Sequence, residues 1–262
     1  MDVAARWTAV VQRPEAEVPL DEAALLISAA AQPDLDVTGQ LERLDGIAQR
    51  VTTGDLASLN RVLFEEVGLR GDRDGYYDPF NSYLDRVLDR GLGIPITLAV
   101  LQIEVGRRSG VVLEGVGMPG HFLVRDPARP TTLMDPFRSG RSMAVADCQR
   151  LLRETTGSPS RLTPEMLSTT GTHAVLARML ANLDRVFEMK QDRRALSWVC
   201  TLRLALPATA MGDRTQLAAR LAGLGRLDTA ASVLEQVAGE VGSERVRTRL
   251  LEQAEAFRAR LN

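Results

Sequence analysis

The most constraining feature of this sequence is a change of hydrophobic period near the middle of the chain. A strongly apolar stretch, residues 96–110, follows Pro95 and stops at a glycine, which is the pattern of a buried helix. Beyond it, β-like runs with a period of two lie at 111–118, 121–126 and 131–136. We therefore predict a small antiparallel sheet that follows directly on a buried helix.

Helical patterns dominate the rest of the chain, so the expected fold class is α+β. Before the sheet, three stretches have helical composition or apolar side chains at steps of three and four: 20–31, 36–51 and 55–68. After the sheet, a further helical pattern leads into a polar, proline-bearing segment at 156–164. We place a domain boundary beyond it, between a first domain at 1–165, with an enlarged helical part, and a second at 170–262.

The second domain is predicted to be helical throughout. Its expected helices span 172–189, 191–205, 213–224, 227–239 and 243–260. Ala195 and Ala230 lie about 35 residues apart in similar settings, close to the period of tetratricopeptide repeats. A small residue at such a place lets two helices pack closely. The pattern predicts an all-α, tetratricopeptide-like array, with a generic helical bundle as the alternative.

The composition is that of an ordinary globular protein. The 262 residues are 45% hydrophobic and 25% charged, and the formal net charge is −2. That charge gives no indication of a nucleic-acid partner or of an anionic membrane. No apolar run approaches the ~18 residues of a membrane span, and the N-terminus lacks the pattern of a signal peptide. We expect a cytoplasmic protein that binds neither nucleic acid nor membrane.

Cysteine and histidine are scarce and scattered. Cys148 and Cys200 lie in different regions and in no metal-binding spacing, so we expect two free thiols in a reducing compartment. His121 and His173 fall in different predicted domains, and the segment GDRDG lacks the spacing and the terminal glutamate of a calcium loop. We expect neither a metal site nor a cofactor.

His121 and Asp135 are the candidates for chemistry. His121 opens the second β-like run, and Asp135 closes the third. Antiparallel pairing of neighbouring strands would bring the two side chains within about 3 Å of each other. The carboxylate would accept the imidazole Nδ1–H and fix the tautomer, as the third member of a catalytic triad does. A nucleophile is then expected at the N-terminus of the preceding helix, where the helix dipole favours a thiolate.

Several segments carry a family resemblance: LNRVLFEEVGLRGDRDGYYDPFNSYLDRVLDRGLGIPITL, LEGVGMPGHFLVR, MDPF, and RMLANLDRVF leading into RALSWV. Together and in this order they resemble the SirB-type transglutaminase-like family, in which a helix-rich transglutaminase-like domain precedes tetratricopeptide repeats. The resemblance covers nearly the whole chain. It implies a papain-like transglutaminase core, in which His121 and Asp135 match the histidine and the aspartate of that superfamily.

The same resemblance leaves the nucleophile unmatched. In active transglutaminase-like enzymes a cysteine opens the core helix, and at the corresponding place this chain has Pro95. The nearest hydroxyl belongs to Thr97, which is a weak nucleophile without a dedicated base. The resemblance implies that SirB-type proteins generally lack this cysteine.

Three roles are open for His121 and Asp135. They form a structural pair in a former catalytic groove that serves packing or partner recognition. Alternatively, they retain chemistry, with Thr97 or a water molecule as the nucleophile. In the third case, they line a groove that binds a peptide or a small ligand without turning it over.

The loop before the central helix offers further candidate groove residues. Asp78, Asn81 and Tyr83 supply a carboxylate, an amide and a hydroxyl, and with Pro95 they would line the groove opposite His121. The alternative is a self-satisfied loop in which Asp78 and Asn81 cap turns.

We expect the protein to act through interaction, with a regulatory role, because the usual cysteine is missing. The competing expectation is an acyl-transfer enzyme, a hydrolase or a transamidase, that uses the groove around His121 and Asp135. The helical repeats would offer a concave face to a protein or peptide partner, or would only cap the first domain.

Overall fold

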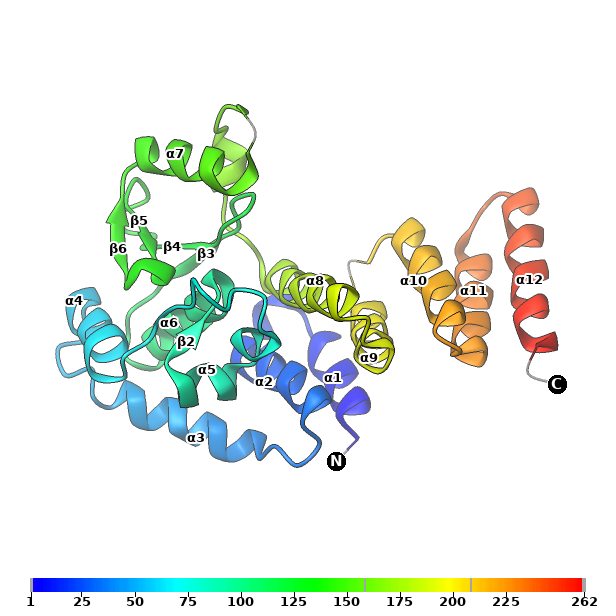
Figure 1. Cartoon of the computed structure of the whole chain (residues 1–262), viewed down its shortest axis with the longest axis horizontal. Coiled ribbons are helices and arrows are strands. Elements are labelled where there is room, and N and C mark those ends of the chain that lie inside the picture. The colour runs from blue at the N-terminus through cyan, green and yellow to red at the C-terminus, as the bar shows by residue number, and fades with distance from the viewer. Residues whose placement is uncertain (1, 158, 208, 261–262) are drawn as a thin grey trace.

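The buried helix predicted from the sequence, α6 (Pro95–Arg108), lies at the centre of the fold (Figure 1). The computed structural model describes residues 2–157, 159–207 and 209–260. Most α6 side chains are buried, because other helices pack around it: α2 (Leu20–Ala31), α3 (Val37–Ala48), α4 (Leu56–Asn60), α5 (Leu84–Arg90) and α8 (Thr172–Lys190). The enlarged helical part predicted before the sheet is therefore a helical shell around one apolar helix.

Two parts of this shell differ from the expectation. The predicted helix at 55–68 changes hydrogen-bonding pattern, since α4 continues as a π-helical segment at Arg61–Glu66. The sequence analysis predicted no helix at the N-terminus, where α1 (Val3–Val11) begins after Asp2, which caps it. Trp7 anchors this helix, because its buried indole Nε1–H donates to the Leu202 carbonyl at 2.9 Å.

The predicted antiparallel sheet follows α6, with its strands in the order β3–β4–β5–β6. The strands are β3 (Glu114–Val116), β4 (Leu123–Arg125), β5 (Leu133–Asp135) and β6 (Arg141–Met143); β6 was not predicted. Leu123 and Leu133 pack under α7 (Val145–Thr156), whereas Val124 and Met134 join the core around α6. Because both faces are covered, successive strand residues are apolar.

A short parallel pair ties the loop before α5 to the start of α6. β1 (Arg70–Gly71) pairs with β2 (Leu92–Gly93), and neither was predicted. Residues 72–83 between them, here called the tyrosine loop, contain all three tyrosines of the chain. The loop is thus fixed at one end by the strand pair and at the other by α5.

The main core continues past the predicted boundary near 165–170. Thr170 docks on the sheet edge, where its N–H donates to the Gly115 carbonyl at 2.8 Å. α8 and α9 (Arg193–Leu204) then contribute to the same hydrophobic cluster as α2 and α6, and that cluster reaches Leu206. The predicted boundary therefore falls too early, because two helices assigned to the second domain complete the first core.

The remaining helices form a stack that extends from this body (Figure 1). They are α10 (Met211–Gly223), α11 (Leu227–Glu240) and α12 (Glu244–Ala259), and they share hydrophobic clusters of their own. Ala195 and Ala230 are both buried near the starts of α9 and α11. The predicted helices of this region are confirmed, while their class of repeat stays a prediction. No helix in the described ranges is both long enough and apolar enough to cross a membrane.

Candidate functional site

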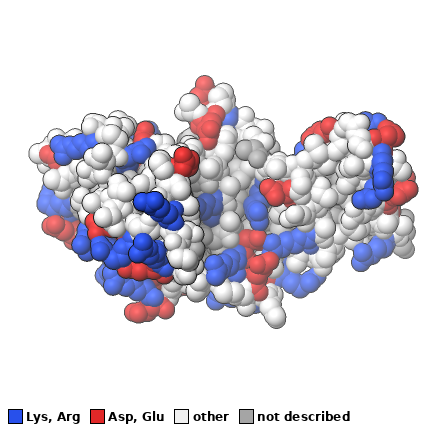
Figure 2. All heavy atoms as spheres, turned by 90° about the horizontal axis from the view of Figure 1, so that it is seen from above, with Lys and Arg blue, Asp and Glu red and all other residues white. Residues whose placement is uncertain are grey.

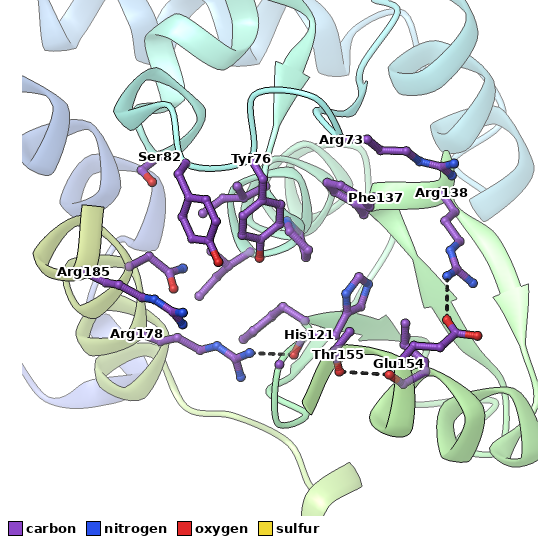
Figure 3. Close-up of a pocket in the computed structure, with 18 of the residues that line it drawn as sticks. Arg73, Tyr76, Ser82, His121, Phe137, Arg138, Glu154, Thr155, Arg178 and Arg185 are labelled. Atoms are coloured by element: carbon purple, nitrogen blue, oxygen red, sulfur yellow. Dashed lines mark hydrogen bonds and ion pairs between the residues drawn. The ribbon is translucent and has the colours of Figure 1, made fainter. Parts of the chain in front are cut away.

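A cavity of about 870 Å³ opens where the sheet, the start of α6 and α8 meet (Figure 3). Its sheet wall includes His121 and Phe137. Its helix wall includes Ser82, Ile94, Pro95 and Ile96, at the end of the tyrosine loop and the start of α6. α8 closes a third side with Arg178, Asn182 and Arg185. The start of the central helix thus lies at the same cavity as His121, as the sequence analysis predicts.

His121 and Asp135 are hydrogen-bonded to each other, which confirms the predicted distance. The His121 Nε2 atom lies 2.8 Å from Asp135 Oδ1. Pairing of Val124 with Met134 brings the start of β4 beside the end of β5, where these two residues lie. The same Oδ1 accepts the Phe137 N–H at 3.1 Å, and Arg138 Nε lies 3.6 Å from Oδ2. Asp135 is fully buried, so its carboxylate is held in one orientation.

The turn before β4 sets the position of the imidazole. Gly120 has a φ of +75°, and a Cβ there would lie 2.6 Å from Thr155 Oγ1, so the turn requires glycine. The His121 N–H then donates to the Met118 carbonyl at 3.1 Å. From the other side, Arg178 Nη2 donates to the His121 carbonyl at 2.8 Å. Both the backbone and the side chain of His121 are therefore anchored.

The ring nitrogen that binds Asp135 differs from the expectation. The sequence analysis assigns Nδ1 to this hydrogen bond, and the structure assigns Nε2. Because a carboxylate is an acceptor, Nε2 carries the proton and the neutral ring keeps Nδ1 as its acceptor atom. Nδ1 makes no hydrogen bond to any residue that the structure describes. The ring packs edge-on against the Phe137 ring, with 6.0 Å between the ring centroids. The ring of His121, which lines the cavity, is thus fixed through Nε2 and keeps Nδ1 free of a hydrogen bond to the described residues.

Thr97 does not supply the missing nucleophile. Its side chain is fully buried in the first turn of α6, and its hydroxyl donates to the Asn81 carbonyl at 2.7 Å. The same oxygen lies 3.0 Å from the Ile94 carbonyl. Thr97 is not among the residues that line the cavity, so the prediction that it acts as a nucleophile with His121 is contradicted. Pro95 is among the residues that line the cavity, and its side chain has no reactive atom.

The other predicted groove residues hold the tyrosine loop together instead. Asn81 is fully buried, and its Nδ2 donates to Asp72 Oδ2 at 3.0 Å and to the Gly75 carbonyl at 2.8 Å. Asp78 accepts the Phe80 N–H and forms an ion pair with Arg90 at 3.0 Å. The alternative of a self-satisfied loop is therefore the one observed for these residues.

Tyr83 is the third correction in this loop. Its ring is buried beside Phe80, with ring centroids 6.3 Å apart, and burial raises the pKa of its phenol. It does not line the cavity, whereas the neighbouring Ser82 does. The loop thus contributes Tyr76, Tyr77 and Ser82 to the cavity in place of the three predicted residues.

Neither cysteine is available for thiol chemistry. Cys148 lies on α7, fully buried in the apolar cluster between α7 and the sheet, and burial raises the pKa of its thiol to about 11. Cys200 is fully buried on α9, and burial raises the pKa of its thiol to about 11 as well. Both are free thiols, and both are protonated at neutral pH. No cluster of three metal-ligating side chains occurs among the residues that the structure describes.

The basic character of the cavity was not among the features predicted from the sequence. Five arginines line it: Arg73, Arg138, Arg141, Arg178 and Arg185. Figure 3 shows Arg178 and Arg185 pointing inward from α8, while Arg73 of the tyrosine loop and Arg138 on the sheet side lie at the opposite edge. The only local signal was on α8, where Arg178, Asn182 and Arg185 have the four- and three-residue steps of one helix face. The other arginines come together only through the tertiary fold.

Comparison with known proteins relates this region to one family. Residues 20–181 match the sequence profile of the Transglutaminase-like superfamily, a match that covers α2 to α8 and includes His121 and Asp135. No solved structure gives a significant match. The matched range ends within α8, before Asn182 and Arg185 of the cavity, and it does not reach the stack of α10–α12.

Similar proteins occur in bacteria and in animals. A UPF0162 protein of Xylella fastidiosa is 39% identical over 194 residues, which cover 69% of this chain and 69% of that protein. A UPF0162 protein of Vibrio cholerae is 31% identical over 144 residues, covering 54% of this chain and 52% of the relative. F-box only protein 21 of Mus musculus is 34% identical over 137 residues, covering 49% of this chain but 21% of that protein.

Proposed function

The chain belongs to the transglutaminase-like superfamily, and from that premise we propose that it is a binding protein, whose cavity holds a ligand without turning it over. One observation carries this proposal. His121 and Asp135 keep a paired, buried geometry beside the cavity, while the start of α6 presents Pro95 and turns the Thr97 hydroxyl inward. The site therefore has an oriented imidazole with no activated nucleophile next to it.

The hydroxyls that do line the cavity support this proposal. They belong to Tyr76, Tyr77, Ser82 and Thr155, and none is hydrogen-bonded to His121 among the residues that the structure describes. The Thr155 hydroxyl donates to the Leu151 carbonyl at 2.9 Å, within its own helix. A serine or threonine needs a base within hydrogen-bond reach to become nucleophilic.

A second candidate function is acyl transfer or hydrolysis with water as the nucleophile. It is favoured by the unpartnered Nδ1 of His121, which could accept a proton from a bound water molecule while Asp135 stabilises the imidazolium. This candidate requires no nucleophilic side chain. It differs from the leading proposal in one testable respect, which is turnover that depends on His121.

The finer family assignment belongs to the same proposal. We place the chain with the SirB-type proteins, on the segments quoted above and on the helix pairs α8–α9 and α10–α11, with their buried alanines early in the second helix. On this view the helices after the sheet are tetratricopeptide-like and bind a protein or peptide partner in the cytoplasm. That role would suit a regulatory protein.

The test compares wild type with His121→Ala, each in a Cys148→Ser/Cys200→Ser background. Removing both buried thiols prevents labelling of transiently unfolded molecules from being read as pocket chemistry. Acyl esters, peptide amides and a glutamine–amine pair are assayed for turnover, and electrophilic probes are assayed for adducts by intact mass. We expect neither turnover nor adducts. Turnover or labelling that His121→Ala removes would establish the second candidate instead.

A further inference from the structure

We propose that the cavity beside His121 binds an acidic polypeptide segment, held in extended form through its carboxylates. This inference rests on the proposed binding function of the same cavity and adds the chemical class of the ligand. It is carried by the charge of the lining, by the lack of internal partners for that charge, and by the shape of the surface around the cavity.

The lining is strongly biased toward positive charge. Arg73, Arg138, Arg141, Arg178 and Arg185 contribute cations, and Glu154 is the only acidic side chain among the described residues that line the cavity. The whole chain has a net charge of −2, so this bias is local. Arginine presents a planar array of donors that matches a carboxylate at two points. A cavity lined in this way favours an anionic oxygen ligand.

Several of these arginines have no carboxylate partner of their own. Elsewhere the chain neutralises its arginines, as with Arg108, which forms ion pairs with Asp21, Asp45 and Glu104. Within the described residues, Arg73 and Arg141 form no ion pair and no side-chain hydrogen bond, and both are exposed. Their charge is therefore available to a ligand.

The other three cavity arginines differ in how far contacts within the protein already occupy their guanidinium groups. Arg185 lies over the Tyr77 ring at 5.6 Å, a contact that leaves its guanidinium edges free to bind. Arg178 is committed to the carbonyls of Met118 and His121. Arg138 forms an ion pair with Glu154, with 3.5 Å between Nη2 and Oε2. We therefore assign ligand binding mainly to Arg73, Arg141 and Arg185.

The surface beyond the cavity is elongated. A second hollow of about 650 Å³ shares Arg73, Phe137, Arg138 and Arg141 with the first, so the two hollows lie next to each other. Its lining includes Arg70, which belongs to strand β1. A compact small molecule would fill only one of the two hollows. An extended chain with carboxylates at intervals can contact both.

A long polyanion such as a nucleic acid fits less well. Figure 2 shows acidic side chains interspersed with basic ones over the face seen from above, and Asp72 and Asp74 line the second hollow itself. A nucleic acid that runs on past the cavity would meet these carboxylates. An acidic segment with neutral residues between its carboxylates can pass Asp72 and Asp74 at neutral positions and place its charges at the arginines, whereas a nucleic acid carries a charge at every nucleotide. Tyr76 and Phe137 offer ring surfaces to the apolar parts of such a segment.

The experiment measures binding of a fluorescein-labelled peptide of alternating glutamate and glycine, with a glutamine–glycine peptide as its neutral counterpart. Fluorescence anisotropy is recorded for wild type, for Arg73→Glu/Arg141→Glu, and for Arg245→Glu/Arg249→Glu, a control with the same change of net charge at two exposed positions on α12. We expect the glutamate peptide to bind, and the double variant to bind it at least ~10-fold more weakly. The control should stay within about 2-fold of wild type, because it lies outside the cavity. Folding of each variant is checked by circular dichroism.

Four results would overturn the proposal. They are no binding to wild type, equal binding of the glutamine peptide, an equal loss in Arg245→Glu/Arg249→Glu, and tighter binding of inorganic tripolyphosphate or of a single-stranded oligonucleotide. The recovered glutamate peptide is also weighed by mass spectrometry. A cut peptide would contradict the proposed non-catalytic function while leaving the ligand class in place, whereas absent binding would contradict the ligand class alone.

Discussion

The sheet wall and the helix wall of the cavity use their polar groups in opposite ways. On the sheet side, a buried carboxylate directs the imidazole of His121 at the cavity and leaves Nδ1 without a partner. On the helix side, Asn81 and Thr97 turn their polar groups inward and bond to each other and to the tyrosine loop. One wall is thus arranged as an orienting pair for chemistry, and the other is arranged as a structural core.

On the proposed function, the two walls differ because only one of them keeps an arrangement that orients a group for chemistry. The sheet wall needs Asp135 for stability, because a buried imidazole requires a hydrogen-bond partner whether or not it reacts. The helix wall has no such constraint on its first residue, and proline at that place favours the start of the helix. A pair that is oriented but lacks a nucleophile is therefore a stable arrangement.

The largest expected effect lies on the helix wall. Asn81→Ala removes the two hydrogen bonds that the buried Nδ2 donates, so Asp72 Oδ2 and the Gly75 carbonyl each lose a donor. We expect a loss of about 2–4 kcal/mol in the free energy of unfolding, measured in urea. Ser82→Ala, next in the chain and at the cavity, is the matched control. A loss below about 0.5 kcal/mol would show that the helix wall is not self-supporting.

The sheet wall gives the next effect. Asp135→Asn replaces the charged acceptor of His121 Nε2–H and of the Phe137 N–H with a neutral amide. We expect a loss of about 1–3 kcal/mol in the free energy of unfolding. A melting temperature indistinguishable from that of wild type would show that the pair contributes nothing to stability, and that its geometry then calls for a functional explanation.

A third prediction concerns the thiol behind the sheet wall. Burial raises the pKa of Cys148 from 9.0 in the unfolded chain to about 11. Between these values the unfolded chain has already lost the thiol proton that the folded chain retains, so stability falls as the pH rises from 9 through 11. We expect Cys148→Ser to reduce this fall by on the order of 1–2 kcal/mol, measured by urea unfolding at pH 8 and pH 10.5. An equal loss of stability in both proteins would mean that the Cys148 thiol ionises over the same pH range in the folded and in the unfolded chain.

The smallest expected effect concerns Thr97, which we predict to contribute to stability and not to ligand binding. Thr97→Val keeps the volume of the side chain and removes the hydrogen bond to the Asn81 carbonyl. We expect a loss of about 1 kcal/mol in the free energy of unfolding. Binding of the acidic peptide and labelling by electrophiles should not change. A selective change in either, with stability intact, would place Thr97 back at the cavity.

The sequence was informative where the signal was local. The apolar residues at 96–110, 20–31 and 36–51 predicted helices correctly. Each of these helices packs its apolar side chains into the same core, so the pattern is visible within a short stretch of sequence. β6 and the β1–β2 pair are too short for a period to show. The interaction of Thr97 with Asn81, and the convergence of Arg73 with Arg141, join segments that only the tertiary fold brings together. The His121–Asp135 pair was predictable because both residues flank adjacent strands, although the choice of ring nitrogen was not.

The central claim is that the cavity lacks a nucleophile, and its most direct test is to introduce a thiol there. Pro95→Cys places a thiol at the first residue of α6, on the cavity that His121 lines. With both native cysteines changed to serine, its alkylation by iodoacetamide at pH 7 is compared with that of Val112→Cys, at a position that is 67% exposed. We expect the thiol at residue 95 to react at least ~10-fold faster, because the helix N-terminus and His121 Nδ1 favour its thiolate, and we expect His121→Ala to abolish this advantage. A rate at residue 95 that does not depend on His121 would contradict the claim that this site lacks only its nucleophile.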